Sequence, residues 1–184
     1  MPNVPVPTPP GSFWGLKFHQ VAIYTWNIGA ATDWWKHMGY DNWVFDSATL
    51  NGVEKGEDDE YRHATKVGHM AFNYDILPCE LEYVMYSSRT RRPGDPRTGS
   101  EPFISHMSTY VSDIKDEISR LYITHNIQPY HRFHTQDHHN PNLPEGTYFE
   151  EAIYDTRLGL GFDLKLIEKC HNNEPRREDS NAGD

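Results

Sequence analysis

The stretch LKFHQVAIYT (16–25) is the part of the sequence on which the fold prediction depends most. It is rich in β-branched and aromatic residues and is bounded by Gly15 and the Asn27 region, so it predicts a largely buried strand. A helix is expected directly after it, because Asn27 can act as N-cap and Gly39 can end the helix in the left-handed conformation. Apolar residues repeat at helical spacing between these caps: Ile28, Ala31, Trp35 and Met38.

Three further strands are expected in the first half of the chain. The first is a short aromatic strand near 43–46, followed by the acidic loop EKGEDDEYR (54–62). Two apolar segments come next, VGHMAFNYDI (67–76) and CELEYVMYSS (79–88), and Pro78 separates them. The predicted order of this half is therefore βαβββ.

The same order recurs in the second half. EPFISHMSTYV (101–111) predicts a strand, and Ser112 or Asp113 can cap the helix that follows it. A strand near 129–134 and a histidine-rich loop precede two final strands, TYFEEAIYDT (147–156) and GFDLKLIEK (161–169). We therefore expect an α+β fold of two βαβββ modules whose mixed β-sheets curl around a central site.

The domain organisation follows from composition. Residues 1–12 are rich in proline and predict a flexible arm, whereas residues 171–184 are polar and charged and predict a disordered tail. Between them we expect one domain, 13–170, with module one at 13–88 and module two at 101–170.

Charge and cysteine content exclude several classes of protein. The net charge is −10 and no basic stripe runs along the chain, so nucleic acid is not an expected partner. Two distant cysteines, Cys79 and Cys170, form neither a metal motif nor a disulfide framework. No long apolar run or leader pattern is found, so no membrane contact is expected and the predicted location is cytoplasmic.

Polar residues that interrupt the strands point to a metal site. His19 and His106 lie in the first strands of the two halves, 87 residues apart, while Glu82 and Lys165 lie in the last strands, 83 apart. These near-equal offsets indicate equivalent positions. Two histidines and a carboxylate suit a divalent metal such as Fe(II), Mn, Zn, Ni or Co. The alternative is that the histidines are hydrogen-bonded structural residues and that Glu80 and Glu82 share a solvated sheet face.

Four segments carry a resemblance to a known family: HQVAIYT, ELEY, ISHMSTYV and YDTRLGLGFDLKLIE. Over residues 16–169 the chain resembles the vicinal oxygen chelate superfamily, which includes glyoxalase I, epimerases, bleomycin-resistance proteins and extradiol dioxygenases. The resemblance implies one central metal ion held by His19, Glu82 and His106. The family's second glutamate falls on Lys165, and Asp163 or Glu80 is an alternate ligand.

Three functions are compatible with this pattern. The function that we expect first is a mononuclear non-haem Fe(II) dioxygenase acting on a small aromatic or enolisable substrate that chelates through oxygen, because a triad with open positions suits Fe(II) oxygen chemistry. The second is a glyoxalase- or epimerase-type isomerase or lyase in which the metal is a Lewis acid. The third is a metal-free protein that sequesters a small molecule. Lys165 is a candidate catalytic residue, as a base or as the partner of an anionic oxygen.

Further residues are candidates for contacts with a small-molecule substrate. His134 and His138 lie in YHRFHTQDHHNPN (130–142), which is either a solvated loop or a cover over the pocket mouth that supplies an acid or base. Arg89 and Arg91 either clamp an anion or belong to a linker between the modules. Tyr110 is a third candidate for substrate binding, and the resemblance implies a homodimer.

Overall fold

The structure is a computed structural model that describes residues 12–13, 16–56, 58–86 and 102–172. The expected arm 1–12 and tail 171–184 lie largely outside the described residues, and the predicted substrate contacts Arg89 and Arg91 lie wholly outside them. No helix in the described part of the chain is long and apolar enough to cross a membrane.

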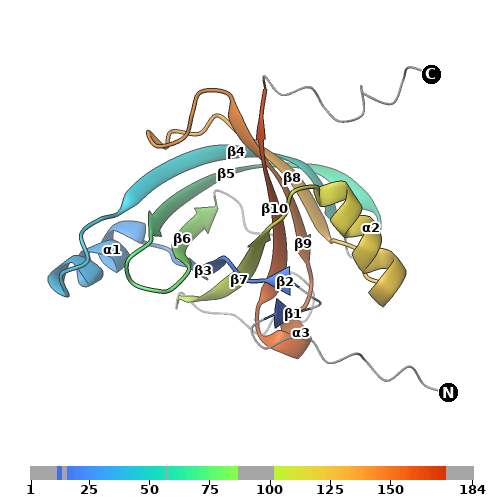
Figure 1. The fold of residues 1–184 in the computed structure, drawn as a ribbon, viewed down its shortest axis with the longest axis horizontal. Helices are drawn as coiled ribbons and strands as arrows, with labels where there is room; N and C mark the ends of the chain where they lie inside the picture. The colour runs from blue at the N-terminus through green and yellow to red at the C-terminus, as the bar shows by residue number, and fades with distance from the viewer. Residues whose placement is uncertain (1–11, 14–15, 57, 87–101, 173–184) are drawn as a thin grey trace.

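The first module contains five principal elements, and the second repeats their order (Figure 1). The first module consists of β3 (Gln20–Tyr24), α1 (Ile28–His37), β4 (Val44–Lys55), β5 (Tyr61–Asn73) and β6 (Glu80–Tyr86). The second consists of β7 (Phe103–Tyr110), α2 (Ile114–His125), β8 (His131–Gln136), β9 (Thr147–Tyr154) and β10 (Asp163–His171). The short elements are β1 (Ser12–Phe13), β2 (Leu16–Lys17) and α3 (Arg157–Leu160).

Eight strands close into one barrel in the order β10-β7-β3-β6-β5-β4-β8-β9. The modules meet at two antiparallel seams, β3 with β7 and β4 with β8. Within each module the first strand runs parallel to the last one, β3 with β6 and β7 with β10. The predicted pair of βαβββ modules is confirmed, and the two curled sheets join into a closed wall.

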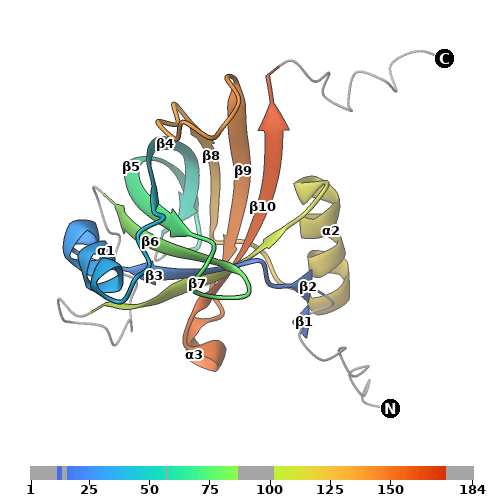
Figure 2. The same cartoon turned by 60° about the vertical axis from the view of Figure 1, so that its left-hand side comes forward.

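The two helices cover opposite outer flanks of this wall (Figure 2). α1 begins at Asn27, whose side chain accepts the Ala30 N–H at 2.9 Å, as the capping prediction required. Of the two expected caps for α2, Asp113 is the one used, and it accepts the Asp116 N–H at 3.0 Å. Each helix buries an apolar stripe against the outside of the barrel, so the interior is left to side chains from the strands.

Two local predictions need correction. The expected strand 16–25 is broken at Phe18 and His19, because Leu16–Lys17 pairs with Ser12–Phe13 whereas Gln20–Tyr24 joins the barrel. The strand expected near 43–46 extends over Val44–Lys55, and the two ends of the acidic segment 54–62 pair with each other, Glu54 with Arg62 and Lys55 with Tyr61, so that only its middle connects the strands. Cross-strand pairing in this hairpin stabilises the ends of a segment whose local composition predicted a loop.

Strand register sets the correspondence between the modules. Gln20 pairs with Glu80 across β3 and β6, and His106 pairs with Asp163 across β7 and β10. Gln20 is therefore the equivalent of His106, an offset of 86 residues. The helix caps, Asn27 and Asp113, are separated by the same 86 residues.

Candidate functional site

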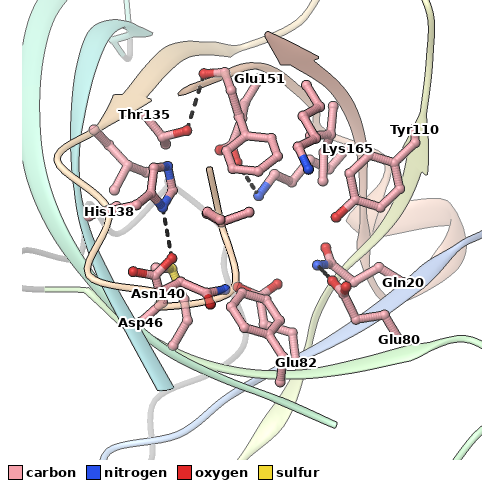
Figure 3. Close-up of a pocket in the computed structure, with 18 of the residues that line it drawn as sticks. Gln20, Asp46, Glu80, Glu82, Tyr110, Thr135, His138, Asn140, Glu151 and Lys165 are labelled. Atoms are coloured by element: carbon pink, nitrogen blue, oxygen red, sulfur yellow. Dashed lines mark hydrogen bonds and ion pairs between the residues drawn. The ribbon is translucent and has the colours of Figure 1, made fainter. Parts of the chain in front are cut away.

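A cavity of about 290 Å³ lies inside the barrel. Polar side chains reach it from several strands, with Gln20, Glu82 and Lys165 on one part of its wall and Asp46, Thr135 and His138 on another (Figure 3). The polar or charged lining residues are Gln20, Asp46, Tyr74, Glu80, Glu82, Tyr86, Tyr110, Thr135, His138, Asn140, Glu151, Lys165 and Lys169. The apolar ones are Ala48, Leu50, Met70, Phe72, Leu143, Phe149 and Ile167.

The residue from the first strand that faces this cavity is Gln20, and His19 is absent from the lining. His19 precedes β3, and its Nδ1 accepts the backbone N–H of Tyr110 at 3.2 Å. Side chains alternate between the faces of a strand, so a slip of one residue moves a side chain to the opposite face. The predicted equivalence of His19 and His106 is therefore wrong by one residue.

Glu82 and His106 do meet, as the sequence predicted. His106 Nε2 lies 3.2 Å from Glu82 Oε2, and both side chains are at most 3 % exposed. Burial raises the pKa of Glu82, but the contact with His106 and the charge of Lys165 lower it by more, so the net pKa is below the usual 4.5. Glu82 is consequently a buried carboxylate that stays ionised.

The expected metal-binding triad is not assembled. Among the residues that the structure describes, no three His, Cys, Asp or Glu side chains converge as a metal site would require. Gln20 takes the inward position expected for His19, and an ammonium, Lys165, lies where the resemblance implied a second carboxylate. The donor set therefore does not fit the divalent metal that the resemblance implied.

Gln20 is held by hydrogen bonds on both ends of its amide. Its Oε1 accepts the Ser108 hydroxyl at 2.6 Å, and its Nε2 donates to Glu80. Burial raises the pKa of Glu80 above 4.5, although the Gln20 hydrogen bond opposes this shift. Two carboxylates on one strand face thus differ in electrostatic state, with Glu80 easier to protonate than Glu82.

Lys165 forms a buried ion pair with Glu151. Its Nζ lies 2.8 Å from Glu151 Oε1, and the two side chains are 5 % and 9 % exposed. Burial lowers the pKa of Lys165, but the surrounding carboxylates, Glu151 first and then Glu82 and Glu80, raise it above the usual 10.5. Lys165 is therefore a lasting positive charge in the cavity and is not suited to act as a base near neutral pH.

His138 and Asp46 form a second pair on the other side of the cavity (Figure 3). His138 Nδ1 lies 2.7 Å from Asp46 Oδ2, while Asp46 Oδ1 accepts the backbone N–H of His139 at 2.8 Å. The Nε2 of His138 is buried and has no hydrogen-bond partner within the described part of the chain. A carboxylate on Nδ1 orients the ring and leaves the Nε2 lone pair available.

The remaining predicted site residues divide between the cavity and the barrel wall. Tyr110 lines the cavity, and burial raises the pKa of its hydroxyl above the usual 10, so it remains a proton donor. His134 faces away from the cavity and contacts Glu150 at 3.2 Å. Asp163 also lies outside the lining, where it pairs with Arg157 and accepts the Tyr130 hydroxyl at 3.2 Å.

Three residues of the site were missed by sequence reasoning: Gln20, Asp46 and Glu151. For Gln20 a signal existed, because the two helix caps are 86 residues apart and that offset matches Gln20, not His19, to His106. Asp46 and Glu151 carried no such signal. Their partners, His138 and Lys165, lie on other strands or loops.

The fold and cavity define an α+β barrel of glyoxalase-like topology, with a polar and largely buried floor of a size that suits a small molecule. No protein-family model matches the chain, and no curated protein matches it. Several solved structures are similar to it, and two of them are described next. The hypothetical protein BH1468 from Bacillus halodurans C-125 is 16% identical, with a TM-score of 0.47, over 86% of this chain and 98% of that one. Methylmalonyl-CoA epimerase from Mycobacterium tuberculosis is 13% identical, with a TM-score of 0.44, over 90% of this chain and 91% of that one.

Proposed function

We propose that this protein binds a small carbonyl compound in the barrel and catalyses proton transfer at the carbon next to the carbonyl, as an isomerase or lyase. The observation that carries the proposal is the His138–Asp46 pair, because His138 lines the same cavity as Lys165 and its buried Nε2 has no hydrogen-bond partner in the described part of the chain. The cavity therefore contains a base, His138, and a fixed positive charge, Lys165. Enolisation needs both groups, one to accept the proton and one to stabilise the oxyanion.

His138 is the proposed base. Asp46 holds Nδ1 at 2.7 Å, so Nε2 is the nitrogen that accepts the proton from carbon, and the carboxylate stabilises the imidazolium that forms. Asp46 is itself fixed by the His139 N–H, which limits rotation of the pair.

Lys165 is the proposed partner of the developing oxyanion. As the C–H bond breaks, its electron pair moves to the carbonyl oxygen, and the negative charge is stabilised by a nearby cation in a buried site. The Tyr110 hydroxyl, which burial keeps protonated because its pKa is raised, is available as a hydrogen-bond donor to the same oxygen.

The apolar wall indicates the rest of the substrate. Leu50, Met70, Phe72 and Phe149 also line the cavity, so an apolar or planar body is the part of the ligand they would contact. The charged side chains then act on one end of the ligand.

The dioxygenase prediction finds no support in this donor set. It required two histidines and a carboxylate facing the cavity with open positions, whereas the inward side chains include an amide and an ammonium. A small-molecule partner, a homodimer and a cytoplasmic setting stay predictions.

Substituted phenols of graded acidity test the proposal without knowledge of the substrate, because a phenolate resembles a planar enolate. Absorbance spectra of the bound phenol report its ionised fraction. We expect bound phenols to ionise at least about tenfold more than in solution, equivalent to about 1.4 kcal/mol. The increase in the ionised fraction on binding should be smaller in the His138→Gln and Lys165→Met variants. Lys169→Met is the matched control, since Lys169 lines the same cavity from the same strand but is exposed.

The outcomes separate the candidate functions. Phenols that bind but stay neutral would support a sequestering protein and contradict proton transfer. Absence of saturable binding would contradict both. Equal ionisation in the wild type and in His138→Gln would remove His138 from its role as base.

A further inference from the structure

The pseudo-twofold relation between the modules places four buried side chains at two pairs of equivalent positions; Gln20, Glu82 and Lys165 line the cavity, and His106 lies behind them, 3.2 Å from Glu82. Gln20 in β3 corresponds to His106 in β7, and Glu82 in β6 corresponds to Lys165 in β10. The four strands are neighbours in the barrel, in the order β10-β7-β3-β6. An amide, an imidazole, a carboxylate and an ammonium therefore lie on four neighbouring strands of the barrel, with the imidazole in contact with the carboxylate.

All four side chains are buried, so water does not screen them. Gln20, Glu82 and His106 are each 2 % exposed, and Lys165 is 4 % exposed. Such groups need partners within the protein. Gln20 binds Ser108, Glu82 contacts His106, and Lys165 pairs with Glu151 at 2.8 Å.

The side chains of Gln20, Glu82 and His106 are able to bind a divalent cation. The ammonium of Lys165 disfavours the binding of one. An ammonium cannot donate electrons to a metal, and its charge repels a cation strongly where the effective dielectric constant is low. Glu151 and Glu82 supply the negative charge that compensates Lys165. The Lys165 side chain therefore already supplies the positive charge that stabilises these buried carboxylates.

We infer that the ammonium of Lys165 takes the place of a divalent metal in this barrel, so that the protein works without a bound metal ion and a single substitution converts the patch into a metal site. The inference rests on strand register and on the donor set, and it does not require that His138 acts as a base.

Metal binding by variants of position 165 tests this directly. Wild-type protein and Lys165→Glu are dialysed against chelator and then titrated with Zn²⁺, Ni²⁺ or Mn²⁺. Affinity is measured by calorimetry, and stoichiometry by elemental analysis after gel filtration. We expect the wild type to hold no stoichiometric metal. Lys165→Glu should hold about one ion per chain, with an affinity at least about 10- to 100-fold higher, the range that a change around a metal site produces.

Two further variants make the result specific. Lys169→Glu adds a carboxylate to the same cavity from the same strand and should gain no metal. In His106→Ala/Lys165→Glu the gained affinity should fall again. Lys165→Glu leaves several carboxylates without a cation, so Lys165→His, which adds a neutral ligand, serves if the first variant does not fold; thermal melting with and without metal monitors this.

The inference is overturned by any of three results. The first is one tightly bound ion per wild-type chain that His106→Ala releases. The second is no gain of metal in folded Lys165→Glu or Lys165→His. The third is an equal gain in Lys169→Glu, which would mean that added negative charge alone, and not position 165, creates the site.

Discussion

His138 and Asp46 are 92 residues apart in the chain and 2.7 Å apart inside the barrel. Asp46 comes from the start of β4, and His138 from the segment between β8 and β9, so the seam between β4 and β8 brings them together. Both side chains are at most 9 % exposed. The pair is therefore a product of barrel closure.

Asp46→Asn should disturb His138 more than its small change in shape suggests. The amide can present its nitrogen to Nδ1, which favours the other tautomer, and we expect ¹⁵N NMR of His138 to show loss of the Nδ1–H form. Stability should fall by about 1–3 kcal/mol, because buried polar groups lose charge-assisted partners. An unchanged His138 spectrum would contradict the proposed orientation by Asp46.

Removal of the Lys165 ammonium should be costly. Lys165→Met leaves Glu151 buried without its cation, and we expect a loss of about 3–5 kcal/mol in urea denaturation at pH 7. The double variant Lys165→Met/Glu151→Gln should lose less than the sum of the single changes. Because the folded-state pKa of Lys165 is raised, its contribution is fully present below the unfolded value near 10.5 and is lost as pH rises through the folded value.

Lys36 provides the matched control for this measurement. It pairs with Asp33 at 2.9 Å on the surface, where the two side chains are 42% and 61% exposed. Lys36→Met should change stability by no more than about 0.5 kcal/mol. A similar loss for Lys36 and Lys165 would show that burial does not strengthen the inner pair.

Glu80→Gln and Glu82→Gln should shift stability in opposite directions at pH 7. The pKa of Glu82 is depressed, so its ionised form stabilises the fold above the unfolded value near 4.5, and this is lost as pH falls through the folded value. The pKa of Glu80 is raised by burial, so stability falls as pH rises from the unfolded value near 4.5 to the folded value, and the full cost of the ionised form is present above the folded value. Denaturation of both variants at pH 4 and pH 7 measures this, and the same sign for both at pH 7 would contradict it.

His19→Ala and Gln20→Leu test the corrected register. Gln20→Leu removes the partner of Ser108 and Glu80 inside the barrel, so we expect a loss of about 1–3 kcal/mol and altered phenol binding. His19→Ala removes one hydrogen bond to the Tyr110 backbone and should cost about 0.5–1.5 kcal/mol while phenol affinity is unchanged. Loss of phenol binding in His19→Ala alone would restore His19 to the site.

Much of the candidate site was within reach of sequence reasoning. Glu82 and His106 were predicted from polar residues in apolar strands, and Lys165 from matching the last strands at the correct offset of 83 residues. The first strands were matched at 87 when the register requires 86. An error of one residue matters in a strand, because it exchanges the cavity face for the opposite one.

Local order in this chain follows from periodicity and caps. The βαβββ modules were predictable because hydrophobic repeats, Asn27 and Asp113 act over a few residues, and their effects are the same wherever the module ends up. Closure of the barrel decided the rest. It determined which strand face points inward, which partner each buried charge has, and that the Lys165 ammonium lies where a metal ligand was expected. Those properties come from pairing between distant strands, where geometry and desolvation decide which polar groups meet.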